Sequence, residues 1–345
     1  MILAYAIALL LWIAIIIYAT LEGADFGGGI WDFFALGAKG EGIRTLTKEA
    51  IGPVWEANNV WLTYLVVGLF TAFPIVAQLL TTALFIPFVL ILIGIVLRGS
   101  SFVFRSFSTH TRALSAVWGR VFSTSSIITP FLFGTIAATV ASGKLHMTNG
   151  RMPVGLVAAW LTPFTIVMGL MGLALCATIA AVYLTVEAQG REKPELMEAF
   201  RLRGFIASAA LAVLGIVGLI LAPAEAPILW HGLLDHALWA IAIAIGLGIA
   251  MVGMLFYRRY RWARLLVILE TGAIIGTWGL AQLPYIVPPD LTISGAASPP
   301  TTLTELFICT LVGMLMLIPA LWFLFHVFKG GNIIPDVREK EIQDF

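Results

Sequence analysis

Long apolar runs follow one another along almost the whole chain, separated by short polar connections. A helix that crosses a membrane needs about 20 consecutive, mostly apolar residues. The sequence therefore predicts nine spanning helices, at residues 3–33, 53–73, 77–97, 117–141, 154–186, 204–222, 234–257, 263–283 and 303–328. The division between the second and third is the least marked, because only Pro74 and its neighbours Thr71 and Gln78 indicate a turn there.

The composition is also that of a membrane protein. Hydrophobic residues make up 60% of the 345 residues and charged residues 11%, whereas soluble domains contain about 25% charged residues. We expect one integral membrane domain over residues 1–345, with an all-α fold. The first apolar run has no basic residue before it, so we expect a retained spanning helix rather than a cleaved signal peptide.

The basic residues predict an orientation. Successive connections between the predicted helices lie on alternate sides of the membrane. Lys144 and Arg151 fall on one side, and the other 18 of the 20 basic residues fall on the other. These are Lys39, Arg44, Lys48, Arg98, Arg105, Arg112, Arg120, Arg191, Lys193, Arg201, Arg203, Arg258, Arg259, Arg261, Arg264, Lys329, Arg338 and Lys340. Because cytoplasmic loops carry the excess of basic residues, we expect the N-terminus outside and the C-terminus in the cytoplasm. The net charge of +1 gives no indication of nucleic-acid binding.

The spacing of cysteine, histidine and methionine residues does not predict a metal or haem site. Cys176 and Cys309 lie in separate apolar runs, without the spacing of a zinc or iron–sulfur site. The histidines all fall near predicted helix ends or in loops, at His110, His146, His231, His236 and His326. Met168 and Met171 are candidate axial ligands, although methionine in an apolar helix usually serves packing. The chain alone therefore predicts no catalytic centre.

Three acidic residues of the first run, Glu22, Asp25 and Asp32, are candidates for function, because ionisable groups at membrane depth are costly. They lie in the segment LEGADFGGGIWDFF, and spacings of three and seven place them on one helical face. The glycines at 27–29 would let another helix approach closely. The alternative is that these acids mark the end of the helix and lie in interfacial water.

A second polar group opens the next predicted helix, in the segment IGPVWEANNVWL at residues 51–62. An aromatic belt with polar capping would explain Trp55 and Trp61. It explains Glu56, Asn58 and Asn59 poorly, because each of these side chains needs a polar partner. We therefore favour a functional role for the three polar residues.

Three further charged residues fall inside or beside predicted helices. Arg98 and Arg105 lie near the end of the third predicted helix, where snorkelling to the interface would satisfy either one. Glu270 lies deeper, about two turns into the eighth, without a basic residue four positions away. We expect Glu270 to be protonated or paired across helices, and its role stays open.

Several of these segments closely resemble subunit II of cytochrome bd-type quinol oxidases. The matching segments are LEGADFGGGIW at 21–31, GPVWEANNVWL at 52–62, LFTAFP at 69–74, LRGSSFVFRS at 97–106 and LAQLPYIVPPDLTISGAASPPTTL at 280–303. The resemblance runs from end to end, and nine helices with an outer N-terminus is also the family arrangement. Glu56, Ala57 and Asn59 replace residues seen in other members and suggest a cyanide-insensitive-type branch.

The resemblance implies a fold of two four-helix bundles plus one peripheral helix. It also implies a non-haem subunit of a quinol:oxygen oxidoreductase of aerobic respiration, in a bacterial or archaeal cytoplasmic membrane. Subunit I would carry the b-type haems, with haem d left open, and this chain would bind no haem firmly. Quinol and oxygen would be the substrates of the complex. A structural quinone or lipid, and a small single-span accessory subunit, are further partners that the resemblance allows.

The resemblance also implies roles for individual residues. Glu56 matches the family's acid near the oxygen-reducing haems, and Asp25 is its companion in the first helix. The candidates for a proton path from the cytoplasm are Glu56, Asp25, Glu22, Asn58 and Asn59, and those for structural or interface roles are Trp55, Trp61, Arg98 and Arg105.

Two other classes of protein remain open at this stage. A secondary transporter or proton channel would also use carboxylates within the membrane. We find no internal repeat, however, and the Gly-rich and Pro-bearing segments lie near helix ends rather than at the midplane. A purely structural scaffold would not explain Glu56, Asn58 and Asn59 together.

Overall fold

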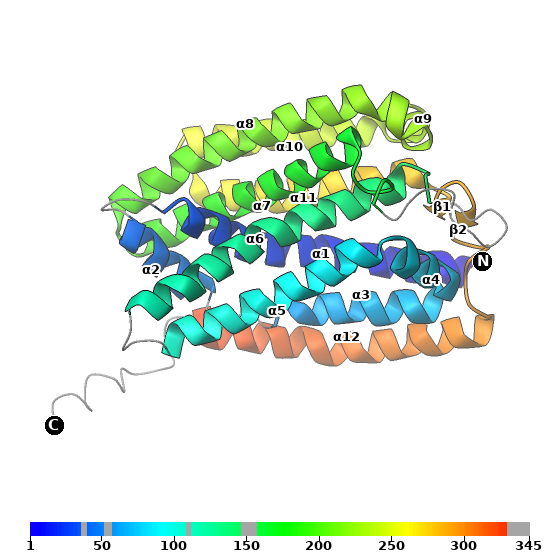
Figure 1. The fold of residues 1–345 in the computed structure, drawn as a ribbon, viewed down its shortest axis with the longest axis horizontal. Helices are drawn as coiled ribbons and strands as arrows, with labels where there is room; N and C mark the ends of the chain where they lie inside the picture. Colours follow the sequence, from blue (N-terminus) through cyan, green and yellow to red (C-terminus); the bar gives the residue numbers. More distant parts are fainter. Residues whose placement is uncertain (36–39, 52–56, 108–111, 146–156, 330–345) are drawn as a thin grey trace.

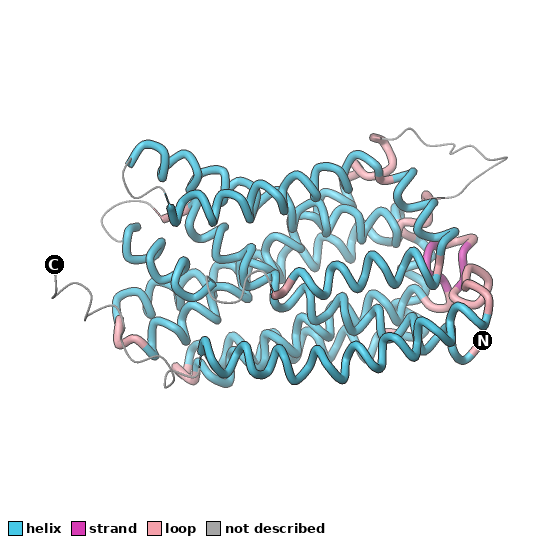
Figure 2. The backbone as a smooth tube through the Cα atoms, turned by 90° about the horizontal axis from the view of Figure 1, so that it is seen from below, coloured by secondary structure: helices cyan, strands magenta, loops and turns pink. Residues whose placement is uncertain are grey.

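The computed structural model describes residues 1–35, 40–51, 57–107, 112–145 and 157–329. Within these ranges, eight helices are long and apolar enough to cross a membrane, or nine if one sharply bent pair counts as a single span. The long helices run side by side along the longest axis of the molecule (Figures 1 and 2). The prediction of an all-α membrane protein is confirmed.

The long helices form two groups of four. The first group is α1 (Ile2–Phe33), α3 (Asn59–Ala72), α5 (Phe85–Phe107) and α6 (Arg112–Ala141), and the second is α7 (Pro163–Gly190), α8 (Pro194–Glu225), α10 (Leu238–Phe256) and α11 (Tyr260–Gln282). Contacts of α7 with α1 and α6, and of α11 with α1, join the two groups. The remaining helix, α12 (Pro300–Lys329), packs on α1 and α3 at the edge of the molecule (Figure 1). This arrangement agrees with two four-helix bundles plus one peripheral helix.

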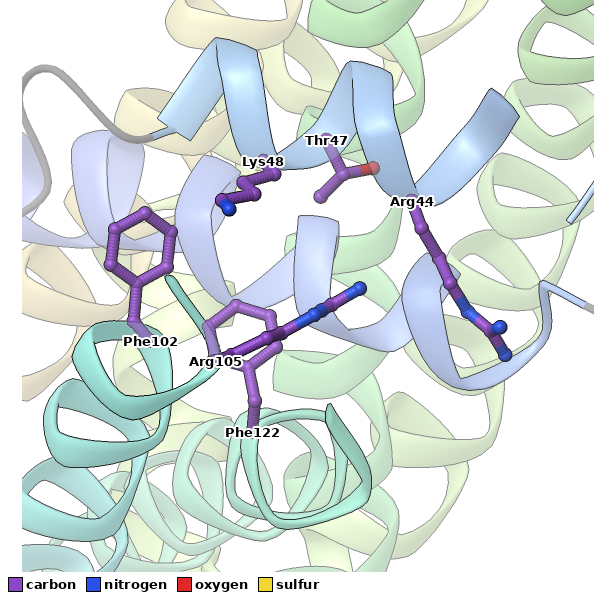
Figure 3. A pocket seen from close by; sticks show the side chains of 6 residues that line it. All are labelled: Arg44, Thr47, Lys48, Phe102, Arg105 and Phe122. Carbon is purple, nitrogen blue, oxygen red and sulfur yellow. The ribbon is translucent and has the colours of Figure 1, made fainter. Parts of the chain in front are cut away.

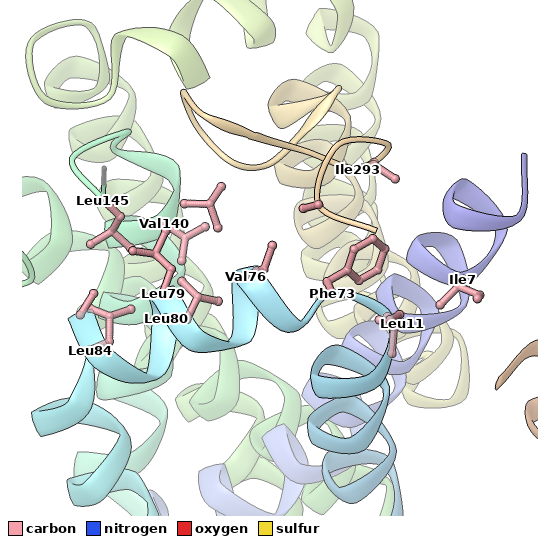
Figure 4. Close-up of a cluster of buried hydrophobic side chains, with 14 of the residues drawn as sticks. Ile7, Leu11, Phe73, Val76, Leu79, Leu80, Leu84, Val140, Leu145 and Ile293 are labelled. Carbon is pink, nitrogen blue, oxygen red and sulfur yellow. The ribbon is translucent and has the colours of Figure 1, made fainter. Parts of the chain in front are cut away.

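The second and third predicted spans differ from the structure. After α3 the chain bends by 116° into the short helix α4 (Pro74–Ala83), and α5 starts only at Phe85. The predicted start of the third span at residue 77 was therefore wrong. Pro74 occupies the first turn of α4, where its missing N–H is tolerated, and it cannot continue α3. Phe73 at the bend is buried, in a cluster that also holds Leu11 and Val76 (Figure 4).

Two further short helices were not predicted. Helix α2 (Gly40–Ile51) is amphipathic and too short to span, and its Ile43 and Leu46 pack against α7 and α8 in one apolar cluster. Helix α9 (Pro227–His236) follows α8 after a single residue, Ala226. In addition, α7 begins at Pro163 and not at the predicted residue 154. Thr162 caps this helix, because its side chain accepts a hydrogen bond from the backbone N–H of Thr165.

The loop before α12 has a defined structure. It contains an antiparallel pair of short strands, β1 (Tyr285–Val287) and β2 (Leu291–Thr292). The Ser298 hydroxyl donates a hydrogen bond to the Thr71 carbonyl oxygen at 2.7 Å, which holds the loop against the end of α3. The bend after α3 is therefore covered by this loop.

Candidate functional site: a row of buried carboxylates on α1

Helix α1 carries Glu22, Asp25 and Asp32 on the side that faces the other helices. Their exposed fractions are 1%, 5% and 4%. With a rise of about 1.5 Å per residue, the row extends over roughly 15 Å along the helix axis. The alternative in which these acids lie in interfacial water does not hold, because all three are covered by protein.

Glu22 forms an ion pair with Arg98 of α5. Arg98 Nη1 lies 3.1 Å from Glu22 Oε2, and the two side chains are 5% and 2% exposed. The guanidinium also lies over the ring of Phe26 at 4.6 Å and the ring of Phe122 at 5.6 Å. Arg98 therefore does not snorkel to the interface, and the expectation that snorkelling would satisfy it was wrong.

Asp32 connects four elements at the end of α1. Arg105 of α5 donates to Asp32 Oδ2 at 3.1 Å, and the Ser123 hydroxyl of α6 donates to the same oxygen at 2.9 Å. Arg44 of α2 lies 3.7 Å from Asp32 Oδ1 and donates a hydrogen bond to the Ala35 carbonyl oxygen. Asp32 thus holds together the ends of α5 and α6 and the short helix α2.

Asp25, between these two ion pairs, contacts the start of α3. Asn58 Nδ2 donates a hydrogen bond to Asp25 Oδ2 at 2.8 Å, and Asn58 is itself buried. An amide at the start of α3 therefore contacts this carboxylate. Asn59, the first residue of α3, is partly exposed.

The predicted residues Glu56 and Trp55 lie outside the residues that the structure describes. Trp61, the second tryptophan of the same segment, is 7% exposed and packs in a cluster with Ala14 and Tyr18 of α1. It is therefore buried between helices.

The predicted close approach at the glycines of α1 is confirmed. A Cβ atom on Gly27 would lie 2.0 Å from the Cys176 carbonyl oxygen of α7, and one on Gly29 would lie 2.1 Å from Ser126 Oγ of α6. Side chains at these positions would push α7 and α6 away. The small residues thus allow α1 to occupy the centre of the molecule.

Glu270 lies in the second bundle, away from the row on α1. It is 7% exposed, and within the described part of the chain its Oε2 atom has no hydrogen-bond partner. Gly248 of α10 faces it, since a Cβ there would lie 2.6 Å from Glu270 Oε1. The sequence left protonation or pairing across helices open for Glu270, and no partner for such a pairing is found among the described residues.

The described residues contain no group of three or more His, Cys, Asp or Glu side chains that could hold a metal ion. His231 and His236 lie in the short helix α9, and the His326 ring stacks on Trp322 near the end of α12. Met168 packs near Gly218 of α8, consistent with a packing role. The described residues thus bring no pair of histidines to the middle of a bundle.

Sequence reasoning did not identify Arg44 and Ser123 as part of this site. Arg44 belongs to a connection, where it contributed only to the count of basic residues, and a serine in an apolar helix gives no signal of its own. Both become partners of Asp32 only through the packing of α2 and α6 against α1.

Comparison with known proteins agrees with this arrangement. A Bacillus subtilis (strain 168) protein named as cytochrome bd menaquinol oxidase subunit II is 23% identical over 329 residues, covering 92% of this chain and 93% of the relative. The Escherichia coli (strain K12) cytochrome bd-I ubiquinol oxidase subunit 2 is 23% identical over 373 residues, covering 96% and 95%. The bd oxidase structure from Geobacillus thermodenitrificans superposes with a TM-score of 0.79 at 20% identity, covering 96% of this chain and 100% of that one.

The similarity is not confined to one segment of the chain. The family described as cytochrome bd terminal oxidase subunit II matches residues 3–328, which include the helices from α2 to α11 and all but one residue each of α1 and α12. A match of this length, together with the shared fold, establishes that the chain belongs to the family of cytochrome bd terminal oxidase subunit II.

Proposed function

We propose that this chain is the non-haem subunit of a respiratory quinol oxidase, which supports the haem-bearing subunit I and delivers protons from the cytoplasm for the reduction of oxygen to water. Family membership makes it one subunit of a multi-pass membrane complex with subunit I. The haems belong to subunit I in this proposal, and this chain supplies acidic and amide groups that accept, hold and pass protons.

The observation that carries the proposal is the row Glu22, Asp25 and Asp32. It begins at the end of α1 that adjoins α2 and reaches toward the middle of the helix, and every member is buried. Reducing oxygen consumes protons inside an apolar bundle, and carboxyl groups can bind and release protons where bulk water is excluded. Asp25 is the central member, and Asn58 Nδ2 donates a hydrogen bond to its carboxylate.

The distribution of charge supports the direction of this path. The end of the molecule with α2 also holds the end of α5, the start of α8 and the connection between α10 and α11, which contain most of the described arginines. By the positive-inside rule we assign this end to the cytoplasm, so that the row on α1 opens toward the side that supplies protons.

One relative is named for menaquinol and another for ubiquinol, at the same 23% identity. A transporter or proton channel, the other class considered from the sequence, has no separate observation in its favour.

The proposal is tested by oxygen consumption of the purified two-subunit complex with quinol in excess. Glu56→Gln and Asp25→Asn keep shape and hydrogen-bonding capacity but cannot carry a proton, so each should slow turnover about tenfold or more. Glu56→Asp should retain much of the rate, because the titrating group survives. Asp290→Asn, at an exposed acid of the outer loop, is the matched control and should leave turnover unchanged.

The haem spectrum of each variant shows whether subunit I is assembled. Normal turnover in fully assembled Glu56→Gln and Asp25→Asn complexes would remove both residues from the proton path. A loss of haem in proportion to the loss of turnover would instead indicate that these residues only hold the subunits together.

A further inference from the structure

Glu270 of α11 stands apart from the charged residues of the first bundle. There, basic side chains gather near Asp32, and Arg44, Lys48 and Arg105 line a small pocket beneath α2 (Figure 3). Glu270 lies in the second bundle, ten residues after the start of α11 and so roughly 15 Å along its axis. It is buried, and within the described part of the chain its Oε2 atom has no hydrogen-bond partner. The proposed proton path does not use this acid.

Three helices of the second bundle bring no opposite charge to Glu270. Helix α10, on which α11 packs most extensively, has no ionisable residue from end to end. Helix α8 has none from residue 204 to residue 222. On α11 itself the nearest charged residue is Arg264, six positions earlier, and its guanidinium lies over the Tyr183 ring of α7 at 5.7 Å. A charge on Glu270 would therefore meet no cation from these helices.

The ionisable residues of α7, α1 and α9 have other surroundings. Cys176 of α7 lies against the glycines of α1, and Glu187 lies 4.0 Å from Arg191. Tyr18 of α1 packs against α6, and the acids of α1 have the partners described above. Helix α9 meets α11 near Ala281, eleven residues further along α11, and its ionisable residues are exposed. The described residues therefore offer Glu270 no ion-pair partner.

Gly248 of α10 makes the space that the carboxyl group occupies. A Cβ atom there would lie 2.6 Å from Glu270 Oε1, so a larger residue would displace the carboxyl group or move α10. Little else fixes the middle of α10, because no residue between Ala240 and Met251 is buried and Ile249 is 69% exposed. The contact of Gly248 with Glu270 is therefore central to the packing of α10 on α11.

The charge state of Glu270 decides whether this contact is stable. An isolated carboxylate in an apolar interior is far more costly than the neutral acid, because neither water nor a cation solvates it. The neutral acid carries its proton on a carboxyl oxygen and can lie against the backbone of Gly248. A carboxylate needs water around it, and a shift of the partly exposed helix α10 would admit that water.

We propose that Glu270 is a proton-binding site, separate from the row on α1, whose proton keeps α10 packed on α11. The bound proton neutralises the carboxyl group in the packed form. When the proton leaves to the solvent, the carboxylate becomes hydrated and the middle of α10 loosens. The proposal goes beyond the proposed function, since it concerns the packing of the second bundle and not turnover.

The first measurement detects the proton itself. Infrared spectra of the purified two-subunit complex near neutral pH should contain a carbonyl stretch of a protonated carboxylic acid that is lost in Glu270→Gln. Glu305→Gln, at an exposed acid of α12, is the matched control and should leave this band unchanged. An identical band in wild type and Glu270→Gln would show that Glu270 is ionised, and would overturn the site.

The second measurement follows α10 by hydrogen–deuterium exchange of peptides from residues 238–256. Because the packed form holds one proton more than the loosened form, its stability is present at low pH and is lost as the pH rises. Exchange in wild type should therefore increase relative to Glu270→Gln by up to about tenfold per pH unit in the alkaline range. Peptides from residues 204–222 of α8 should not show this difference. The same pH dependence in wild type and Glu270→Gln would contradict a role of the proton in holding α10.

A pair of glycines tests the contact without changing the acid. Gly248→Ala should increase exchange of α10 at least about fivefold even near neutral pH, because the new Cβ atom meets the carboxyl group. Gly246→Ala, where a Cβ atom would meet nothing within 4 Å, should not. Equal exchange in the two variants would overturn the assigned contact.

Oxygen consumption separates this site from the proton path. Fully assembled Glu270→Gln, verified by its haem spectrum, should consume oxygen near neutral pH at the wild-type rate, whatever the outcome for Glu56 and Asp25. Slowed turnover in that variant would place Glu270 in the proton path and overturn its separation from the row on α1.

Discussion

The residues of the α1 row show how a membrane protein keeps charge inside an apolar bundle. Glu22 and Arg98 neutralise each other, and two aromatic rings cover the guanidinium. Bringing two charges out of water costs several kcal/mol, and only good geometry offsets that cost. A buried pair of this kind is therefore expected to be far more sensitive to loss of one partner than an exposed pair.

We predict that Arg98→Gln and Glu22→Gln each destabilise the protein by about 3–5 kcal/mol, because each leaves one buried charge without its partner. The double variant should be less destabilised than the sum of the two, since the two amides can bond each other. The measurement is the thermal unfolding midpoint of the purified complex in a double-mutant cycle.

The matched control is the more exposed pair Lys144–Glu225, where the side chains are 35% and 17% exposed. Lys144→Gln there should change stability by no more than about 1 kcal/mol. Strictly additive effects of Arg98→Gln and Glu22→Gln would contradict the coupling between the two charges.

At the residue scale the sequence predicted which acids would share a face, but not what they would contact. The spacing of Glu22, Asp25 and Asp32 is a local property of a helix. Their partners are not local, since Arg98 lies 76 residues from Glu22 and Asn58 lies 33 residues from Asp25. Only packing of α5 and α3 against α1 creates these contacts, and Glu56, which carries much of the sequence-based hypothesis, is outside the described residues.

At the scale of elements, hydrophobicity predicted the number of spans better than their ends. Residues on both sides of Pro74 are apolar, so hydropathy does not reveal that α4 turns away from α3 by 116°. Before Phe85, where α5 begins, the only polar residues of α4 are the uncharged Gln78, Thr81 and Thr82, which hydropathy reads as part of an apolar run. Helix α2 was missed for another reason, because its 12 residues are amphipathic but too few to span a membrane.

The contact of α1 with α7 provides a prediction at this scale. Gly27→Ala would place a Cβ atom 2.0 Å from the Cys176 carbonyl oxygen, and a backbone atom cannot move aside without shifting α7. We expect a loss of about 1–3 kcal/mol, the usual cost of overpacking, measured by the unfolding midpoint.

Gly246 of α10 is the matched control, because a Cβ atom there would meet nothing within 4 Å. Gly246→Ala should stabilise the protein by up to about 1 kcal/mol through helix propensity alone. The same response at both positions would show that the α1–α7 contact does not depend on the missing side chain at Gly27.

At the scale of the whole molecule, the fold places its charge asymmetrically. Helix α1 begins at the end of the molecule that holds β1 and β2, and α12 ends toward the opposite end, where α2 and the α10–α11 connection also lie (Figure 1). The described residues thus agree with the alternation of connections between two sides from which the orientation was predicted. The orientation itself determines whether the acid row on α1 opens toward the cytoplasm, so the proposed proton path depends on it.

We predict that, in intact cells, an impermeant thiol reagent labels Ser294→Cys, between β2 and α12, and does not label Lys193→Cys between α7 and α8. Both positions are exposed, so a difference in labelling reports the side of the membrane and not burial. The parent chain, with only Cys176 and Cys309, gives the background. Permeabilised cells should label Lys193→Cys as strongly as Ser294→Cys, which shows that the position is reactive.

Labelling of Lys193→Cys alone in intact cells would invert the orientation. The acid row would then open to the outside, and it could not deliver protons from the cytoplasm.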